Sequence, residues 1–580
     1  MCGIFFCLHQ ERNLSPDPES EAPSIHDIRA TLKTINAQRG PDAQRTVSLT
    51  IPASPSGYTD ITKPPIVHLE FFSSELRLRG TAPIVQPHES NNNILCWNGE
   101  VFEGLDIKPD QNDGAILFQE LCKLQSPSEI AALFGSIEGP YAFVFFHAAS
   151  QHVFLGRDPL GRRSLLIHRP TPLQPHLLLS SATCGPSPGY DIEELSTEFL
   201  HYIDFSCFVD EVCLSTIPRQ NAETKAPTPF AIPSRVNPVL PPDDFPKLTT
   251  LDVIPPHLSQ AVDDLINQLN RSTRLRVLDI PSIDCNLINP SKVAILFSGG
   301  IDCTVLTYLA HRNIPLEEPI DLLNVAFENP RKLQDQDTEH AKHKNSGKPE
   351  QPRRPVYKVP DRMSGLEELQ ELRRLCPDRQ WNFVEINVPY AESQAARPTI
   401  EALMFPSNTV MDLSLAMALY FASRGIGQVR RQKDNEPEPY ISPARVILSG
   451  LGADELLGGY SRHRTAFTHG WKALVDELQL EIDRIPTRNL GRDDRIISSH
   501  GKETRYPFLS LSVVNFLASL PVHFKLDPRL ETGMGDKMLL RLAARKLGLM
   551  EASQRKKRAM QFGSYSARMH GEKKGDVPLE

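Results

Sequence analysis

The sequence contains no apolar run that approaches the length needed to span a bilayer, and its first residues lack the basic start, apolar middle and small-residue cleavage site of a secretory signal. Basic residues are not in excess: 63 Lys and Arg face 71 Asp and Glu, and the net charge of −8 gives no support for a nucleic-acid groove or an anionic membrane surface. The ten cysteines include no CxxC pair, which argues against a disulfide framework or structural zinc. These absences predict a cytoplasmic protein with reduced thiols and no nucleic-acid or membrane partner.

A chain of 580 residues is too long for one hydrophobic core, which predicts at least two domains. Residues 1–215 contain short apolar runs bounded by Gly, Pro and Asn, the pattern of packed strands, and two stretches with helical periodicity. The predicted strands are 66–72, 94–102, 141–146, 152–158 and 176–182, and the predicted helices are 25–38 and 113–124. This order suits an α+β domain of two sheets with helices on their outer faces.

Prolines mark the end of this domain. Ten of them lie within residues 218–256, so we assign 216–257 to a linker or wrapping arm. From 258 to 580 helical and strand-like stretches alternate, which predicts an α/β domain with a parallel sheet covered by helices. Its predicted helices are 258–278, 302–312 and 411–425, and its predicted strands are 292–297, 321–327 and 444–450. Two polar inserts, 332–355 and 428–440, cannot bury enough apolar surface to fold alone and are predicted to be flexible.

Cys2 is set apart by its position. If Met1 is removed, Cys2 carries the free α-amine, whose pKa of about 8 allows it to take the thiol proton. Such a thiol can attack a carboxamide and release ammonia. The developing oxyanion needs donors, which "WNGE" (97–100) supplies as the Asn98 side-chain amide and the Gly99 N–H, while Asp113 can hold a substrate ammonium group. Taken singly these features are weak, since Asn-Gly is more often a hairpin turn and a second-residue Cys is more often inert.

Together the motifs are more specific. "MCGIF", "NGEVF", "IEGPYAFVFF" (137–146) and "GRDPLGRRSLL" (156–166) occur in an order that resembles class II glutamine amidotransferases over nearly all of residues 1–185. The resemblance implies an N-terminal-nucleophile (αββα) glutaminase domain. It also implies that Cys2, Asn98 and Gly99 are catalytic, and that Asn98, Gly99, Glu100 and Asp113 bind glutamine together with an arginine.

The arginine is ambiguous. Members of the family hold the glutamine carboxylate with an Arg on a strand shortly before the Asn-Gly turn. Here "SSELRLRG" (73–80) offers Glu75, Arg77 and Arg79 within a few residues, and a strand turns Arg77 and Arg79 to the same face. We select Arg77; if Glu75 occupies the position instead, glutamine affinity is in doubt.

The stretch "ILFSGGIDCTVL" (295–306) combines a buried strand, a Ser-Gly-Gly turn and the start of a helix, a local arrangement that binds anions through backbone N–H groups. Its spacing differs from a Walker loop and no Lys follows. Asp302 beside a triphosphate requires a cation between them, which predicts Mg²⁺, although a carboxylate in a first helical turn is favourable without any ligand. The stretch resembles the SGGxDS loop of ATP pyrophosphatases, with Cys303 in place of the usual Ser.

A second Gly-rich turn, in "SGLGADELLGGYSRHR" (449–464), is followed by "HGKETRYPFLS" (500–510) and "GDKMLLRLA" (536–544). In this order they resemble the synthetase domain of glutamine-hydrolysing asparagine synthetases, an adenine nucleotide α-hydrolase-like fold, and are most similar to the eukaryotic asparagine synthetase domain-containing proteins. The resemblance implies ATP and Mg²⁺ as cofactors, Asp302 and Asp454 at the metal, and Lys556 or Lys557 stabilising an adenylate. The residues it implies for ATP binding are Phe297, Ser298, Gly299, Gly300, Asp302, Val325, Ser449 and Gly450.

Leu451 departs from the family pattern, in which this loop carries a Glu regarded as the base that deprotonates the attacking ammonia. A leucine cannot accept a proton, and general-base help is worth roughly 10²–10⁴-fold. Two interpretations follow. The chain is an enzyme that uses glutamine, aspartate and ATP to form asparagine through a β-aspartyl-AMP, or it is an impaired nucleotide-binding scaffold on the same fold. A third is amidation or ring closure of a different acid.

Overall fold

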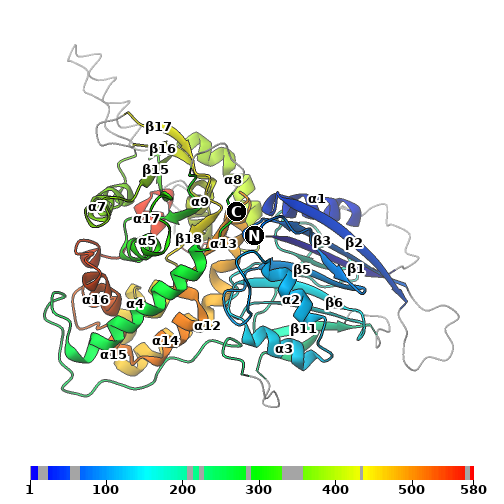
Figure 1. The fold of residues 1–580 in the computed structure, drawn as a ribbon, viewed down its shortest axis with the longest axis horizontal. Helices are drawn as coiled ribbons and strands as arrows, with labels where there is room; N and C mark the ends of the chain where they lie inside the picture. The colour runs from blue at the N-terminus through cyan, green and yellow to red at the C-terminus, as the bar shows by residue number, and fades with distance from the viewer. Residues whose placement is uncertain are drawn as a thin grey trace, which may run out of the picture.

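The computed structural model describes residues 2–10, 24–52, 66–205, 213–220, 227–282, 289–329, 357–430, 436–567, 575 and 577–579. Figure 1 shows an N-terminal unit (β1 to β12) beside a C-terminal unit (α4 to α17), with the start of the chain at their junction. None of the described helices is long and apolar enough to cross a membrane. The eight cysteines within these ranges form no disulfide.

The N-terminal unit contains two antiparallel sheets. The first has the order β10-β8-β9-β1-β3-β2, with β1 (Gly3–Gln10), β2 (Ala43–Pro52), β3 (Ile66–Glu75), β8 (Leu166–His168), β9 (Leu177–Ser180) and β10 (Ile192–Glu194). The second has the order β12-β11-β7-β6-β5-β4, with β4 (His88–Ser90), β5 (Asn93–Gly99), β6 (Tyr141–His147), β7 (His152–Arg157), β11 (Phe199–Asp204) and β12 (Ser215–Pro218). Three helices accompany them, α1 (Ile25–Arg39), α2 (Asp113–Leu121) and α3 (Pro127–Ser136).

Alternation along the strands stacks these elements in four layers. In β1, Ile4 and Phe6 pack between the sheets, while Phe5 packs against α1. On the far side, the outer face of the second sheet packs against α2 and α3 through Phe118 and Phe134. The layers are therefore helix, sheet, sheet and helix, the order that the sequence predicts.

The C-terminal unit is built on a seven-stranded sheet. Its order is β17-β16-β15-β14-β13-β18-β19, with β13 (Val293–Leu296), β14 (Ile320–Phe327), β15 (Trp381–Val388), β16 (Ile426–Val429), β17 (Glu438–Ile441), β18 (Val446–Leu448) and β19 (Glu503–Arg505). Five neighbouring strands of this sheet are parallel to one another: β15, β14, β13, β18 and β19. The longer helices are α4 (Pro256–Val277), α5 (Ile301–Asn313), α7 (Pro360–Leu375), α8 (Tyr390–Met404), α9 (Val410–Arg424), α12 (Trp471–Arg488), α13 (Leu490–Ser498), α14 (Leu511–Ser519) and α16 (Met538–Lys546). The shorter ones are α10 (Ala453–Leu457), α11 (Ser461–Phe467), α15 (Val522–Lys525) and α17 (Met560–Gly563).

One predicted insert is wrong in part. Within 428–440, which the sequence predicts to be flexible, β16 and β17 pair as an antiparallel hairpin at the sheet edge, with Gln428 opposite Glu385 of β15. Backbone hydrogen bonding to an existing sheet compensates for the lack of apolar side chains. The other insert, 332–355, lies outside the described residues.

The proline-rich stretch follows the surface of the C-terminal unit. Residues 227–255 contain no helix or strand. Three of their backbone N–H groups donate to the helices beside them: Ser234 to Asn515 Oδ1 (2.8 Å), Val236 to Gln479 Oε1 (2.8 Å) and Asn237 to the Ala518 carbonyl (2.8 Å). The stretch is therefore held against α12 and α14 rather than extended into solvent.

The two units meet across buried ion pairs. Arg39 of the N-terminal unit lies 2.8 Å from Asp494, and Arg163 lies 2.8 Å from Glu503. In the opposite sense, Glu138 of the N-terminal unit lies 3.2 Å from Arg276. All six side chains are almost completely buried. A charge held in the interior requires a partner, so these pairs fix how the units face each other.

Glu138 provides a test of this interface, because it is shared by Arg162 of its own unit and Arg276 of the other. Burial opposes its charged form, but the two arginines outweigh burial and hold the pKa of Glu138 below its usual value. We expect Glu138→Ala to lower the free energy of unfolding by about 3–5 kcal/mol, measured by urea denaturation. Glu120→Ala, which removes an exposed pair with Lys123, is the matched control and should cost about 1 kcal/mol or less. Equal effects of the two variants would contradict a role for buried charge.

Candidate functional site

The first candidate site is the N-terminal cysteine, which lies just before β1 at the junction of the two units (Figure 1). The Cys2 N–H donates to Asn98 Oδ1 (3.1 Å), and Gln86 Nε2 donates to its Sγ (3.6 Å). Arg39 Nε donates to its carbonyl (3.3 Å), so the residue is held on three sides. Burial raises the pKa of the Cys2 thiol to about 12. A reaction at neutral pH therefore needs a base next to the sulfur.

The end of β5 brings the predicted oxyanion donors to this thiol. Asn98 is completely buried, and with its Oδ1 on Cys2, its Nδ2 has no hydrogen-bond partner among the described residues. Buried donors without a partner are rare, and one beside a nucleophile is suited to a developing oxyanion. Gly99 is required sterically, because a Cβ there would lie 2.7 Å from the Trp97 ring and 2.8 Å from the Pro140 carbonyl oxygen.

Asp113, the third predicted group, begins α2. Its Oδ2 accepts from the Val101 N–H (2.9 Å) and from Trp97 Nε1 (3.4 Å). Burial, together with the nearby Glu100, raises the pKa of Asp113 to about 7. A cationic group placed beside this carboxyl would favour its charged form.

Two predicted glutamine-binding residues have other partners. The Arg77 guanidinium donates to the carbonyls of Thr81 (3.1 Å) and Ser282 (3.0 Å). Glu100 forms ion pairs with Arg79 (2.5 Å) and, across the interface, with Arg505 (3.1 Å). Both side chains therefore have partners within the protein, and their assignment to glutamine stays a prediction.

The second candidate site is a cavity of about 600 Å³ in the C-terminal unit. The turn between β13 and α5 forms one wall, where Gly299 adopts φ +75° and a Cβ would lie 2.4 Å from the Gly365 nitrogen. The second Gly-rich turn faces it so closely that a Cβ on Gly450 would lie 2.9 Å from that of Asp302. The residues on the wall from these turns are Ser298, Gly300, Asp302, Cys303, Ser449, Gly450, Leu451 and Asp454.

Phe297 and Val325, the predicted adenine contacts, do not lie on the wall of this cavity. The Phe297 N–H donates to the Leu323 carbonyl (2.9 Å), and its own carbonyl accepts from Asn324 Nδ2 (2.8 Å). Val325 is paired with Ile386 inside the sheet. Both residues take part in the packing of β13, β14 and β15, and their assignment to ATP stays a prediction.

A lysine missed by the sequence analysis joins the two carboxylates of this site. Lys537, almost fully buried, places its Nζ 2.6 Å from Asp302 and 2.7 Å from Asp454. Lys557 lies 2.5 Å from the other oxygen of Asp454 and lines the cavity, whereas Lys556 does not. Although burial opposes ionisation, Lys537 and Lys557 hold the pKa of Asp454 below its usual range. The signal was present in "GDKMLLRLA", but a single Lys at a helix start has no distinctive spacing.

The donor set fits Mg²⁺. Asp302 and Asp454 project from facing turns and lie close enough for one ammonium group to contact both. Mg²⁺ is bound through one or two carboxylates together with phosphate oxygens and water, and these two residues meet that requirement. Further cationic side chains on the cavity wall suit a polyphosphate: Arg488, Arg492 and Arg558.

Leu451 lies on the wall of two cavities. It lines both the large cavity and a second one of about 20 Å³ whose wall also includes Glu455 and Leu509. The Glu455 carboxylate is buried, with Oε1 accepting from the Tyr460 hydroxyl (2.5 Å) and Oε2 without a partner among the described residues. Leu451 therefore presents an apolar side chain to both cavities, and the Glu455 carboxylate lies one helical turn further along the chain.

Comparison with known proteins agrees with the sequence motifs. A family model described as asparagine synthase matches residues 466–574. The human protein named asparagine synthetase domain-containing protein 1 is 36% identical over 98% of this chain and 95% of its own length. The asparagine synthetase domain-containing protein YML096W of Saccharomyces cerevisiae is 32% identical over 98% of this chain and 96% of its own length. A putative glutamine-hydrolyzing asparagine synthetase of Methanocaldococcus jannaschii is 41% identical over 14% of this chain and 16% of its own length. The chain belongs to the asparagine synthetase domain-containing protein family.

Proposed function

We propose that this chain couples amide hydrolysis at Cys2 to ATP-dependent activation of a carboxylic acid in the C-terminal unit, with glutamine supplying the ammonia and aspartate as the acid. The products are asparagine, AMP and pyrophosphate. The observation that carries the proposal is the position of α13. Its Asp494 accepts from Arg39, which holds the Cys2 carbonyl, while its Arg492 and Asp493 line the large cavity. One helix thus contacts both candidate sites.

At the N-terminal site, the thiol attacks the carboxamide carbon and Asn98 Nδ2 stabilises the oxyanion. The base is the α-amine that Cys2 acquires when Met1 is removed, because this amine and the thiol then belong to the same residue. Asn98 Oδ1 lies within hydrogen-bond distance of the Cys2 nitrogen and holds it in place. Hydrolysis of the resulting thioester frees the thiol again. A buried, neutral thiol is unreactive without that amine, which makes removal of Met1 a requirement.

At the C-terminal site, the backbone N–H groups around Ser298 and Gly300 are suited to phosphate, and α5 begins directly after them. In this proposal Lys537 and Lys557, which pair with Asp302 and Asp454, stabilise the negative charge that develops as pyrophosphate leaves. When bound, Mg²⁺ neutralises phosphate charge beside Asp302 and Asp454. Of the two predicted lysines we assign Lys557 to the adenylate, because it lines the cavity.

The small cavity supports internal passage of ammonia. Its volume of about 20 Å³ suits a molecule the size of water or ammonia. It shares Leu451 with the large cavity, and on its other side the Leu509 carbonyl accepts from Arg162 of the N-terminal unit (2.8 Å). The cavity therefore lies between the large cavity and the interface.

A second candidate function is nucleotide binding without turnover, which Leu451 favours because it supplies no base at the cavity wall. Glutamine-dependent AMP formation from aspartate and Mg·ATP decides between them. Its absence, with a melting temperature raised by ATP, would support the scaffold. ATP–pyrophosphate exchange across a panel of carboxylic acids tests the identity of the acceptor.

Replacing Cys2 separates the two half-reactions. We expect Cys2→Ala to reduce glutamine-dependent ammonia release by about three orders of magnitude or more, because the nucleophile is lost. AMP formation with added ammonium chloride should persist, since the C-terminal site is untouched. Ammonia release is measured by a coupled dehydrogenase assay. Unchanged release from glutamine would rule out Cys2 as the nucleophile.

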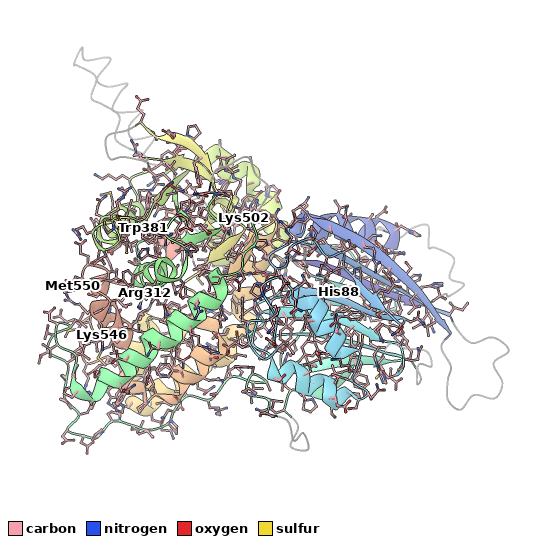
Figure 2. The ribbon with its side chains drawn as sticks, in the orientation of Figure 1. His88, Arg312, Trp381, Lys502, Lys546 and Met550 are labelled. Carbon is pink, nitrogen blue, oxygen red and sulfur yellow. The ribbon has the colours of Figure 1, made fainter. Side chains whose placement is uncertain are left out.

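Lys537→Met tests the ammonium group that joins Asp302 to Asp454. Removing the ammonium group leaves Asp302 and Asp454 facing each other, and we expect AMP formation to fall about 10²–10³-fold. Lys546→Met is the matched control, because Lys546 is the last residue of α16, the helix that begins just after Lys537, but lies at the outer edge of the unit (Figure 2), paired with Asp263. Comparable losses in the two variants would indicate damage to α16 rather than to the site.

Leu451→Glu tests whether the missing base limits the reaction. If ammonia attack is rate-limiting, this variant should form asparagine roughly 10²–10⁴-fold faster than the wild type, measured by amino-acid analysis. Leu451→Gln, similar in size but unable to accept a proton, should show no gain. A gain in both variants would point to polarity at the cavity wall instead of base catalysis.

A further inference from the structure

The end of β3 places a carboxylate beside the nucleophile. The register pairs Gly3 with Ser74, so Cys2 and Glu75 are the next neighbours across the antiparallel ladder. Glu75 is 2% exposed, and no described side chain forms an ion pair or a hydrogen bond with either of its carboxylate oxygens. Burial raises the pKa of Glu75 to about 7, and the nearby Ile84 N–H and Arg77 offset this only in part.

No described arginine near this thiol is left to bind a substrate carboxylate. Arg77 is engaged by two backbone carbonyls, Arg79 by Glu100, and Arg39 by Asp494. Free glutamine would therefore bring its α-carboxylate next to Cys2, where the described charged groups without an ion pair are the carboxyl groups of Glu75 and Asp113. Such a charge, desolvated and facing a carboxylate, is strongly disfavoured.

Two further side chains define what the pocket accepts. Asn98 Nδ2 is completely buried and has no hydrogen-bond partner in the described part of the chain. It belongs to the amide whose Oδ1 accepts from Cys2, so it is free to donate to an acceptor such as a carboxamide oxygen. Asp113 is a second buried carboxyl whose pKa is raised to about 7. The surroundings of Cys2 thus combine one hydrogen-bond donor for the reacting amide, Asn98 Nδ2, with two carboxyl groups that can pair with a positive charge, Glu75 and Asp113.

We infer that the amide donor hydrolysed at Cys2 is a primary carboxamide that carries positive charge where free glutamine carries its α-carboxylate. This rests on the proposed role of Cys2 as an amide-hydrolysing nucleophile and changes its substrate class. In the reaction the thiol sulfur bonds to the carboxamide carbon, the C–N bond breaks, and the thiol proton leaves with nitrogen as ammonia. Water then cleaves the thioester, giving a carboxylic acid and the free thiol.

The test compares two amides on full-length protein whose N-terminal Cys2 is verified by mass. One is L-glutamine; the other is 5-aminopentanamide, which lacks glutamine's α-amino group and carries an ammonium group on the carbon that corresponds to glutamine's carboxyl carbon. We expect kcat/KM for ammonia release to be about tenfold or more higher with 5-aminopentanamide. Glu75→Arg should reverse this preference, and Glu75→Gln, nearly identical in size, should reduce it about tenfold if the Arg variant does not fold.

Glu120→Arg provides the control, since it makes the same charge change at the exposed end of α2 and should leave the ratio unaltered. A wild-type preference for glutamine overturns the inference but leaves the proposed function standing. Equal losses with both amides in Glu75→Gln also overturn it, because Glu75 then serves the chain's own α-amine rather than the substrate. Hydrolysis of neither amide overturns both the inference and the proposed role of Cys2.

Discussion

The contact on which both sites depend is the buried pair of Arg39 and Asp494. Arg39 reaches from the end of α1 to the Cys2 carbonyl and, across the interface, to α13. Asp494 also accepts from the Ser164 N–H (3.1 Å), so a single carboxylate holds two segments of the N-terminal unit. Since each buried charge needs its partner, a displacement of either unit would leave charges unpaired in the interior. The position of Cys2 is thus coupled to the position of the large cavity.

The two sites have opposite electrostatic character. The wall of the large cavity in the C-terminal unit carries Lys557 and Arg492, and Lys537 pairs with its two carboxylates, Asp302 and Asp454, an arrangement suited to polyphosphate with a divalent cation. Around Cys2, Arg39 is paired with Asp494 across the interface and Arg79 with Glu100 of its own unit, and the charged groups without an ion pair among the described residues belong to Glu75 and Asp113. Ion pairing therefore shapes the chemistry of the first site, because it withdraws cations that a carboxylate-bearing substrate would need.

Much of the fold follows from local patterns. The predicted helix 25–38 corresponds to α1, and the predicted strand 321–327 to β14, because apolar residues at helical or strand spacing must face a core wherever they are placed. The prediction for 428–440 was wrong in part because a hairpin at a sheet edge is stabilised by backbone pairing, which leaves no apolar signature. Arg77 and Glu100 show the same limit of local patterns, since each has a partner from a distant segment, Ser282 and Arg505 respectively.

By itself the sequence determined that the chain has two chemically distinct halves, with Cys2, Asn98 and the two Gly-rich turns at their centres, since these features rest on residue type and spacing over a few positions. Only the tertiary structure decided which charges are free to act. It showed that Lys537 joins Asp302 to Asp454, that Arg79 and Arg505 occupy Glu100, and that Glu75 stands beside Cys2 with no ion pair in the described part of the chain. Charge pairing acts between atoms a few ångströms apart whose residues can be hundreds of positions apart, and no local pattern records that distance.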